Sequence, residues 1–386
     1  MVLRRLALVL CAALLLACVG QAAGAPPPRV GATAVLVGNG KTGEILYERK
    51  ADARVPMASI TKLMTALVTL EHRRPGQAVT VRGPAPSIGE STVSLRAGER
   101  LSVRDLLAAA LIQSANDAAY ALATNVGNGS VARFVGLMNA EARELGLDDT
   151  RYVRPDGLDT AGHYSSADDT FVLARKAMAN RLVRGLVRKR AARIGGGRTV
   201  RTWNDLLGRF PGLVGVKTGH TSGAGWSQVA AAWRHGLSVY AVILGSPGRE
   251  RRNADLAKLL EWGFDQYGRV TLVRAGDRYA TAAIPFSDER VGLVAAEGAE
   301  AVVRLRPGTS FEERVVAPAL VSLPVRRGQK LGEVVVTDGD RVLARRPLVA
   351  ARAVPETSTR ERLGWYADRA LDEAGGMLGS VFGAIG

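Results

Sequence analysis

The sequence is poor in cysteine and histidine. Its two cysteines, Cys11 and Cys18, both lie close to the N-terminus, so the rest of the chain cannot hold a disulfide framework. Its four histidines share no metal-ligand spacing with cysteines or carboxylates. We therefore expect no metal site and no cofactor, and any chemistry has to come from ordinary side chains.

The apolar run at the start of the chain is too short to span a bilayer. Two arginines precede Leu6–Ala17, and small residues follow up to Ala25, which is typical of a secretory signal peptide. We expect residues 1–24 to be this signal, cleaved between Ala22 and Ala25. Lipidation at Cys18 is left open as an alternative.

Acidic residues are outnumbered. The chain has 52 lysines and arginines against 36 acids, a net charge of +16, which indicates an anionic partner such as nucleic acid, lipid head groups or a carboxylate-bearing polymer. The densest basic stretch, residues 181–201, has few aromatic residues between its charges, and the signal directs the chain away from nucleic acid. We expect no nucleic-acid partner and interpret this stretch as a solvated helix and loop.

The strongest chemical signal is a serine and a lysine at the start of an apolar helix. Ser59 and Lys62 are three residues apart, so both lie on one helix face and the amine can reach the hydroxyl. A neutral lysine can take the proton of a serine nucleophile, provided that its pKa falls by roughly three units from ~10.4. Because such a pair also arises by chance, it needs support from further motifs.

A second polar group, Ser114 and Asn116, interrupts another apolar segment. Ser102 is predicted to cap that helix, with Asp105 three residues later completing a start like a capping box. Polar residues after such a buried run are costly to bury unless they are hydrogen-bonded or used in a site. The alternative is an ordinary helix that ends in a polar loop.

The third motif is Lys217-Thr218-Gly219, which apolar strand candidates flank in an expected antiparallel sheet. The lysine supplies a positive charge for a carboxylate, and the glycine lets a peptide approach the strand backbone. The same triplet occurs at residues 41–43, where the surrounding pattern predicts a hairpin turn. We assign the site to the later copy.

In this order, the three motifs resemble those of the penicillin-binding protein and serine β-lactamase superfamily. The stretches around Ser59, Ser114 and Lys217, together with residues 162–167 and 259–264, resemble more narrowly the low-molecular-mass penicillin-binding proteins. These are serine-type D-alanyl-D-alanine carboxypeptidases of the peptidase S11 type. The likeness covers nearly the whole chain after the signal.

The resemblance implies an α/β (α+β) transpeptidase-like domain, an antiparallel sheet flanked by helices, that removes the terminal D-alanine from peptidoglycan pentapeptide stems and is acylated by β-lactams. The implied catalytic residues are Ser59 as nucleophile, Lys62 as base, Ser114 as proton carrier to the leaving amine and Asn116 as a positioning residue.

The implied binding residues are Lys217, Thr218, Gly219, His220 and Arg252. Of these, Lys217, Thr218 and Arg252 receive the terminal carboxylate, and the N–H of His220 joins that of Ser59 in the oxyanion hole. Trp203 departs from the pattern, because some relatives carry an arginine there.

The pattern changes along the chain. We expect a catalytic domain at residues 29–266 and a small all-β domain at 268–353, where short alternating runs are separated by turns. In the tail, residues 356–386, apolar side chains recur at steps of three and four. This predicts an amphipathic helix that lies on a membrane surface; docking on the β domain, or disorder, is the alternative.

Other activities stay open. The motifs separate a carboxypeptidase poorly from a D,D-endopeptidase that cuts cross-links. A β-lactamase would need a carboxylate to activate the deacylating water, and no Glu-x-x-x-Asn segment lies between Ser114 and Lys217. A non-catalytic wall-binding protein would be expected to lack Ser59 or Lys62. We predict an exported peripheral enzyme at the periplasmic face of the inner membrane, with stem peptides and β-lactams as ligands.

Overall fold

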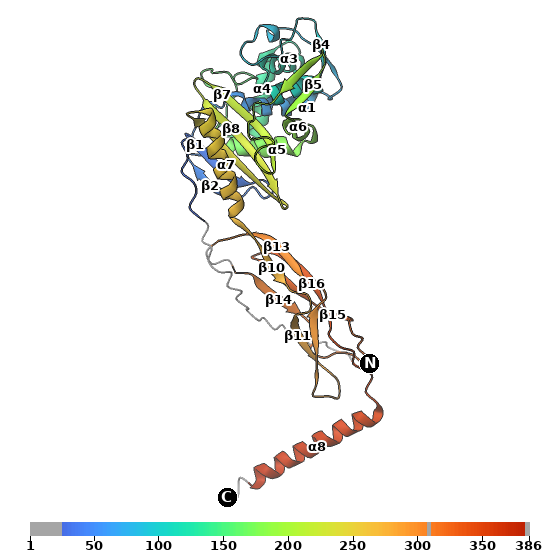
Figure 1. Cartoon of the computed structure of the whole chain (residues 1–386). Helices are drawn as coiled ribbons and strands as arrows, with labels where there is room; N and C mark the ends of the chain where they lie inside the picture. The colour runs from blue at the N-terminus through green and yellow to red at the C-terminus, as the bar shows by residue number, and fades with distance from the viewer. Residues whose placement is uncertain (1–24, 307–309, 383–386) are drawn as a thin grey trace. The chain divides into compact units, whose positions relative to one another are not determined.

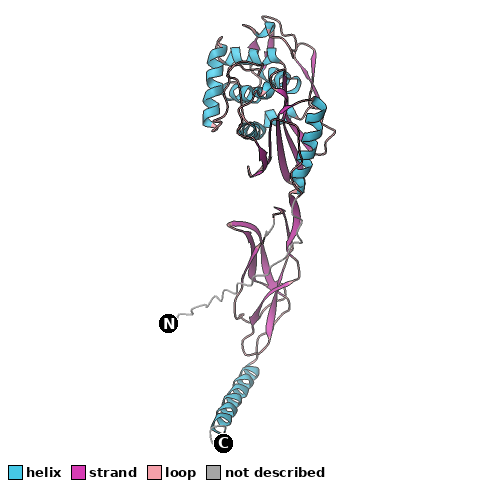
Figure 2. Ribbon diagram, turned by 90° about the vertical axis from the view of Figure 1, so that its left-hand side faces the viewer, coloured by secondary structure: helices cyan, strands magenta, loops and turns pink. Residues whose placement is uncertain are grey.

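The computed structural model describes residues 25–306 and 310–382, with residues 372–382 as helical backbone only. The predicted signal, residues 1–24, lies outside the described residues. The described chain divides into two compact units, Ala25–Gln266 and the part from Tyr267 onward. Helices and a sheet build the first unit, whereas strands followed by a helix build the second (Figures 1 and 2).

A five-stranded antiparallel sheet, in the order β2-β1-β9-β8-β7, forms the centre of the first unit. Its strands are β1 (Ala34–Asn39), β2 (Ile45–Arg49), β7 (Leu213–Thr221), β8 (Gly225–Arg234) and β9 (Leu237–Ser246). The β8–β9 turn places His235 and Gly236 at positive φ, as tight hairpins require. Because β7 is the last strand in the order, one of its edges is left for other contacts.

The sheet separates two hydrophobic cores, because successive residues of a strand point to opposite faces. Along β9, one core takes Tyr240, Val242 and Leu244, and the other takes Val239, Ala241 and Ile243. Helix α7 (Arg249–Asp265) covers the second core with Leu256, Leu259 and Leu260, at the spacing of a helix face. Figure 1 shows α7 lying along this sheet.

The other helices of the unit contribute to the larger core on the opposite face. They are α1 (Lys62–His72), α2 (Val103–Ala108), α3 (Asn116–Val126), α4 (Val131–Glu144), α5 (Ala167–Ala179) and α6 (Arg181–Val187). Ser102 caps α2, as predicted, by accepting a hydrogen bond from the Asp105 N–H at 3.1 Å. The predicted buried helix therefore forms, and it ends in a π-helical turn, η3 (Ala109–Gln113).

Short elements complete the unit. They are the 3-10 turns η1 (Ala58–Thr61) and η2 (Ala85–Ser87), and the strand pairs β3 (Ala78–Thr80) with β4 (Arg100–Ser102) and β5 (Ala191–Ile194) with β6 (Arg198–Arg201). The basic stretch 181–201 thus forms helix α6 and a hairpin, where a helix and a loop were predicted. The hairpin turns at Gly196 and Gly197, both at positive φ.

The second unit contains the predicted all-β module. Its five-stranded antiparallel sheet has the order β11-β12-β16-β15-β14, and β10 pairs with β13. The strands are β10 (Tyr267–Val273), β11 (Arg278–Ala283), β12 (Arg290–Ala295), β13 (Ala299–Arg304), β14 (Glu312–Val316), β15 (Lys330–Asp338) and β16 (Arg341–Ala350). Alternating residues such as Val291, Leu293, Val334 and Val336 form its core, so the sequence period of two correctly indicated strands.

Helix α8 (Thr359–Phe382) follows this sheet. It begins with a capping box, in which the Glu361 carboxylate accepts hydrogen bonds from the Ser358 N–H and hydroxyl at 2.7 and 2.8 Å. Trp365 and Tyr366 pack edge-on against Phe286, with ring centroids 6.0 and 5.8 Å from it. The start of the helix is therefore attached to the β module; the last residues of the predicted tail, 383–386, lie outside the described residues.

Candidate active site

Ser59 lies in the 3-10 turn η1, which leads directly into α1. The turn starts from Ala58 in the left-handed region, at φ +50°, a conformation that alanine seldom adopts. Lys62 is the first residue of α1 and is fully buried. Its Nζ lies 2.7 Å from Ser59 Oγ, so the three-residue spacing does bring the amine to the hydroxyl.

Three oxygen atoms surround the Lys62 amine. Besides Ser59 Oγ, the Asn116 Oδ1 and the carbonyl oxygen of Asp156 each lie 2.7 Å from Nζ. Both of these oxygens can only accept hydrogen bonds. They can take the two N–H groups of a neutral amine, which leaves its lone pair directed at the Ser59 hydroxyl. The arrangement thus orients Lys62 as a base toward Ser59.

Burial also makes the neutral form accessible. The pKa of Lys62 falls from 10.5 to about 8, mainly because of burial; Arg154 also lowers this pKa, whereas Asp156, Glu90 and Asp117 raise it. A shift of this size corresponds to about 3 kcal/mol between the two protonation states. Arg154 is the cation whose charge lowers the pKa of Lys62, and the charge of Lys62 in turn lowers the pKa of Lys217.

Ser114 faces a second buried lysine. Its backbone is left-handed, at φ +67°, where the π-helical turn ends, so Ser114 and Asn116 point to different partners. Lys217 Nζ donates to Ser114 Oγ at 2.8 Å and to the Thr218 carbonyl at 2.8 Å. Burial, followed by the charges of Lys62 and Arg252, lowers the pKa of Lys217 well below its usual value. The Ser114–Lys217 pair is therefore suited to moving a proton.

Gly219 explains how β7 and Ser59 come together. A Cβ at Gly219 would lie 2.9 Å from the Met57 carbonyl and 3.2 Å from the Ser59 nitrogen, so any larger residue would push η1 away from the strand. His220 follows with its ring stacked on Trp226, at a centroid distance of 4.0 Å. The structure thus brings the backbones of Ser59 and the Lys217-Thr218-Gly219 strand side by side.

Two arginines lie at the far end of the same cavity. Arg249 and Arg252 both bond Asp205, at 2.6 Å and 3.3 Å respectively. The hydrogen bond from Arg249 holds the pKa of Asp205 at about 2, and burial lowers the pKa of Arg252 to about 10. The predicted Arg252 is almost fully enclosed, with 2% of its side chain exposed, whereas Arg249 exposes 39%. Arg249 is therefore the more accessible cation, and sequence reasoning missed it.

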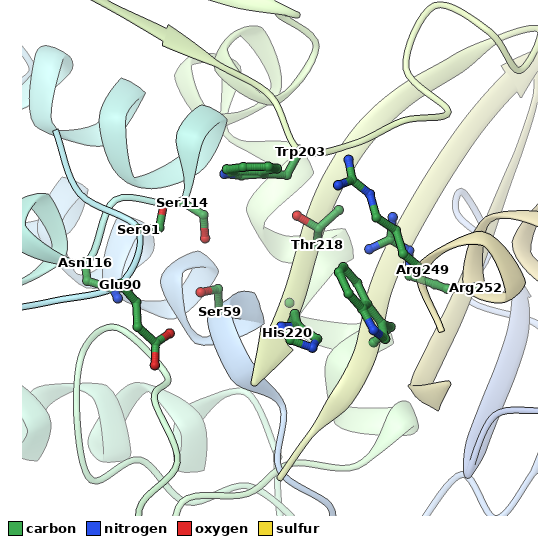
Figure 3. Close-up of a pocket in the computed structure, with 12 residues that line it drawn as sticks. Ser59, Glu90, Ser91, Ser114, Asn116, Trp203, Thr218, His220, Arg249 and Arg252 are labelled. Carbon is green, nitrogen blue, oxygen red and sulfur yellow. The ribbon is translucent and has the colours of Figure 1, made fainter. Parts of the chain in front are cut away.

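Ser59, Ser114 and the two arginines line one cavity of about 260 Å³. Figure 3 shows Ser59 in the middle, Glu90 and Asn116 on one side, and Arg249 and Arg252 on the other. Trp203 roofs the space near Ser114: its Nε1–H donates to the Gln113 carbonyl at 2.8 Å, and the Arg249 guanidinium lies 5.7 Å from its ring. The residues that line the cavity are Ser59, Glu90, Ser91, Ser114, Asn116, Trp203, Thr218, Gly219, His220, Trp226, Arg249 and Arg252.

Buried polar residues support the turn that carries Ser59. His163 bonds Thr61 Oγ1 at 2.8 Å and accepts the Val153 N–H at 3.0 Å. Burial lowers its pKa to about 4, so His163 is neutral near pH 7 and links Thr61 to the loop that carries Val153. Asp156 carries the carbonyl that binds Lys62. Because Asp156 makes this contact through its backbone, the type of its side chain could not have indicated the role.

Within residues 25–306 and 310–382 no group of three His, Cys, Asp or Glu residues could hold a metal ion.

Comparisons with known proteins agree with this geometry. A family model described as D-alanyl-D-alanine carboxypeptidase matches residues 21–248, and one described as penicillin-binding protein 5, C-terminal domain, matches residues 267–356. The chain is 30% identical over 320 residues to the D-alanyl-D-alanine carboxypeptidase DacF of Bacillus subtilis, covering 80% of this chain and 82% of that relative.

Two solved structures are similar as well. Penicillin-binding protein 5 from Haemophilus influenzae matches with a TM-score of 0.63 and 26% identity, covering 86% of this chain and 100% of that one. The ampicillin-bound form of penicillin-binding protein D2 from Listeria monocytogenes matches with a TM-score of 0.57 and 33% identity, covering 62% of this chain and 99% of that one. The first likeness spans both units, and the second covers a smaller share of the chain.

Proposed function

The chain belongs to the D-alanyl-D-alanine carboxypeptidase family, and we propose that it removes the terminal D-alanine from peptidoglycan pentapeptide stems through an acyl-enzyme on Ser59. As a family member it is a serine-type hydrolase that binds penicillins. The observation that carries the proposal is the pair of contacts, Lys62 Nζ with Ser59 Oγ and Lys217 Nζ with Ser114 Oγ, beside one cavity.

In the acylation step, Ser59 Oγ attacks the carbonyl carbon between the two D-alanines while its proton moves to Lys62. When the tetrahedral intermediate collapses, the C–N bond breaks and the leaving amine takes a proton through Ser114. Asn116 holds Lys62 in line for this transfer. Water then hydrolyses the ester, which releases the shortened stem and restores the Ser59 hydroxyl.

Backbone N–H groups of Ser59 and His220 are the donors we propose for the oxyanion hole. The close approach of η1 to β7 at Gly219 supports this assignment. Removal of one such donor typically lowers the rate by about 10² to 10³. We assign the terminal carboxylate to the cationic end of the cavity, where Thr218, the more accessible Arg249 and the predicted Arg252 form the lining. Lys217 lies buried behind Thr218 and donates to its carbonyl.

Two tryptophans at the cationic end of the cavity favour the trimming of stems over the cutting of cross-links. An endopeptidase has to accept a leaving group that carries a further stem, whereas a carboxypeptidase releases free D-alanine. Trp203 and Trp226 flank the cationic end of the cavity, and Trp203 is fixed by its bond to the Gln113 carbonyl. Two indoles at this end leave room for a small leaving group.

We further propose that the enzyme is exported and binds the periplasmic face of the inner membrane through the tail helix α8. Leu363, Tyr366 and Leu371 are exposed there by 66%, 58% and 70%, and such apolar side chains can enter a membrane surface. Among the described residues, no helix has the length and apolar character that crossing a membrane requires. Vesicle sedimentation with and without residues 356–386 tests this, and equal binding would reject the anchor.

Release of D-alanine from a soluble pentapeptide, and from a cross-linked dimer, tests the proposed activity. Wild type should release D-alanine from the pentapeptide much faster than it cleaves the dimer, and Ser59→Ala should do neither. Faster cleavage of the dimer would establish the endopeptidase alternative. Release by Ser59→Ala at the wild-type rate would reject the proposed nucleophile.

A further inference from the structure

Glu90 is the acidic residue among the twelve that line the cavity, and the mechanism above gives it no role. Its side chain lies on the side of Ser59 opposite to Arg249 and Arg252 (Figure 3). Among the described residues, no hydrogen bond or ion pair engages its carboxylate. The cavity therefore has a negative end and a positive end, with the nucleophile between them.

The backbone holds Glu90 in place at some cost. Its φ is +62°, in the left-handed region that residues other than glycine and asparagine seldom adopt. Asn116 secures both neighbours, because its Nδ2 donates to the Gly89 carbonyl at 3.0 Å and its N–H donates to the Ser91 carbonyl at 2.7 Å. A glycine at position 90 would adopt this left-handed conformation without strain. The formation of the turn therefore does not require the carboxylate of Glu90.

Glu90 also works against the catalytic base. Its charge raises the pKa of Lys62, as those of Asp156 and Asp117 do, whereas the charge of Arg154 lowers it. An exposed carboxylate that keeps the base protonated is unfavourable for acylation. Its presence in the cavity is therefore better explained by a ligand group that it binds.

The polarity of the cavity indicates what that group is. The leaving D-alanine carries the terminal carboxylate, which the arginine end attracts, so the acyl part of the substrate extends from Ser59 toward Glu90. The residue that precedes the two D-alanines then passes beside this carboxylate. A carboxylate forms short, strong hydrogen bonds with a charged donor such as an ammonium group, and Glu90 lines the cavity with its carboxylate exposed.

We propose that Glu90 binds the free side-chain amine of a diamino acid that directly precedes the D-alanine pair, and so selects stems in which this amine is not cross-linked. The inference rests on the proposed function and names the substrate class of the same site. A stem whose amine has been acylated in a cross-link carries no charge there and loses the contact.

The test uses Nα-acetyl-L-lysyl-D-alanyl-D-alanine and the same peptide acetylated at Nε. Wild type should prefer the free amine by about tenfold in kcat/KM, mostly through KM, as expected for a hydrogen bond to a charged group. In Glu90→Gln the ratio of the two values should fall toward one, and Glu90→Asp should retain part of it. Glu144→Gln removes the same charge from an exposed position of α4 and should keep the wild-type ratio.

Other outcomes separate the competing explanations. Equal kcat/KM of wild type for both peptides would overturn the amine contact while leaving the carboxypeptidase activity intact. A fall in kcat for both peptides in Glu90→Gln, with accumulation of acyl-enzyme, would instead assign Glu90 to deacylation. Absence of D-alanine release from either peptide by wild type would reject the proposed function itself. Labelling of Glu90→Gln by a penicillin shows that the variant is folded.

Discussion

The triplet Lys-Thr-Gly occurs twice in this chain, and its two copies lie in opposite environments. Residues 41–43 form the tip of the β1–β2 hairpin, where Lys41 and Thr42 are exposed. Residues 217–219 lie within β7, where all three are buried. Asn39 Oδ1 fixes the first copy by accepting the N–H groups of Lys41 and Thr42 at 2.9 and 3.1 Å. The second copy is held by the sheet and faces Ser114.

The glycine has a different purpose in each copy. Gly43 is at φ +83°, so the hairpin needs its conformational freedom. Gly219 has ordinary strand geometry, and it is required because a Cβ would meet the turn that carries Ser59. A short motif thus indicates a site only when its element brings it to the other motifs.

The largest expected difference between the two copies is the loss of activity when the lysine of each copy is replaced. Lys217→Ala should lower kcat/KM for D-alanine release by about 10² or more, because it removes the partner of Ser114 and a charge from the cationic end. Lys41→Ala, at the exposed hairpin tip, should stay within about twofold of wild type. Similar losses in the two variants would remove the distinction between the copies.

The glycines should separate activity from stability. Gly219→Ala should reduce acylation by about tenfold to 10², because the new methyl group displaces η1 and misplaces Ser59. Gly43→Ala should retain full activity and lose about 1 kcal/mol in urea unfolding, because alanine disfavours a positive φ. Should Gly219→Ala acylate at the wild-type rate, the close approach would not be required for the oxyanion site.

The second copy lies among buried lysines, Lys62 and Lys217. The pH dependence of kcat/KM tests the effect of this burial on Lys62. Lys62 has to be neutral to accept the proton, and its pKa is about 8. We therefore expect kcat/KM to fall about tenfold for each pH unit below this value and to level off above it. A profile that is flat between about pH 6 and 9 would show that a different base is used.

The smallest effect concerns Trp203. Trp203→Ala should raise the ratio of cross-link cleavage to pentapeptide trimming by about three- to tenfold, because the roof of the leaving-group end is removed. Trp203→Phe keeps a ring and should lie between the two. An unchanged ratio in Trp203→Ala would mean that this residue does not restrict the leaving group.

Much of the fold was predictable because it depends on local patterns. Alternation indicated the strands of the β module, and Ser102 with Asp105 marked the start of α2. The order and spacing of the three motifs indicated the site, because Ser59 and Lys62 share one turn of chain and each distant motif is short and distinctive.

The remaining site residues had no local signal. Asp156 acts through its carbonyl, and Glu90 lines the cavity through a left-handed turn that its sequence does not favour. Arg249 could be recognised as a site residue only from the structure, in which it pairs with Asp205 and lies beside the Trp203 ring. Such residues are selected by tertiary contacts, which a single sequence does not display.

Intact mass after a short incubation with a penicillin tests the central claim most directly, namely that Ser59 is the nucleophile and is activated beside Lys62. Wild type should gain the mass of one penicillin, and Ser59→Ala should gain none although it stays folded. The account would be contradicted by an unchanged mass for wild type, or by equal labelling of Ser59→Ala.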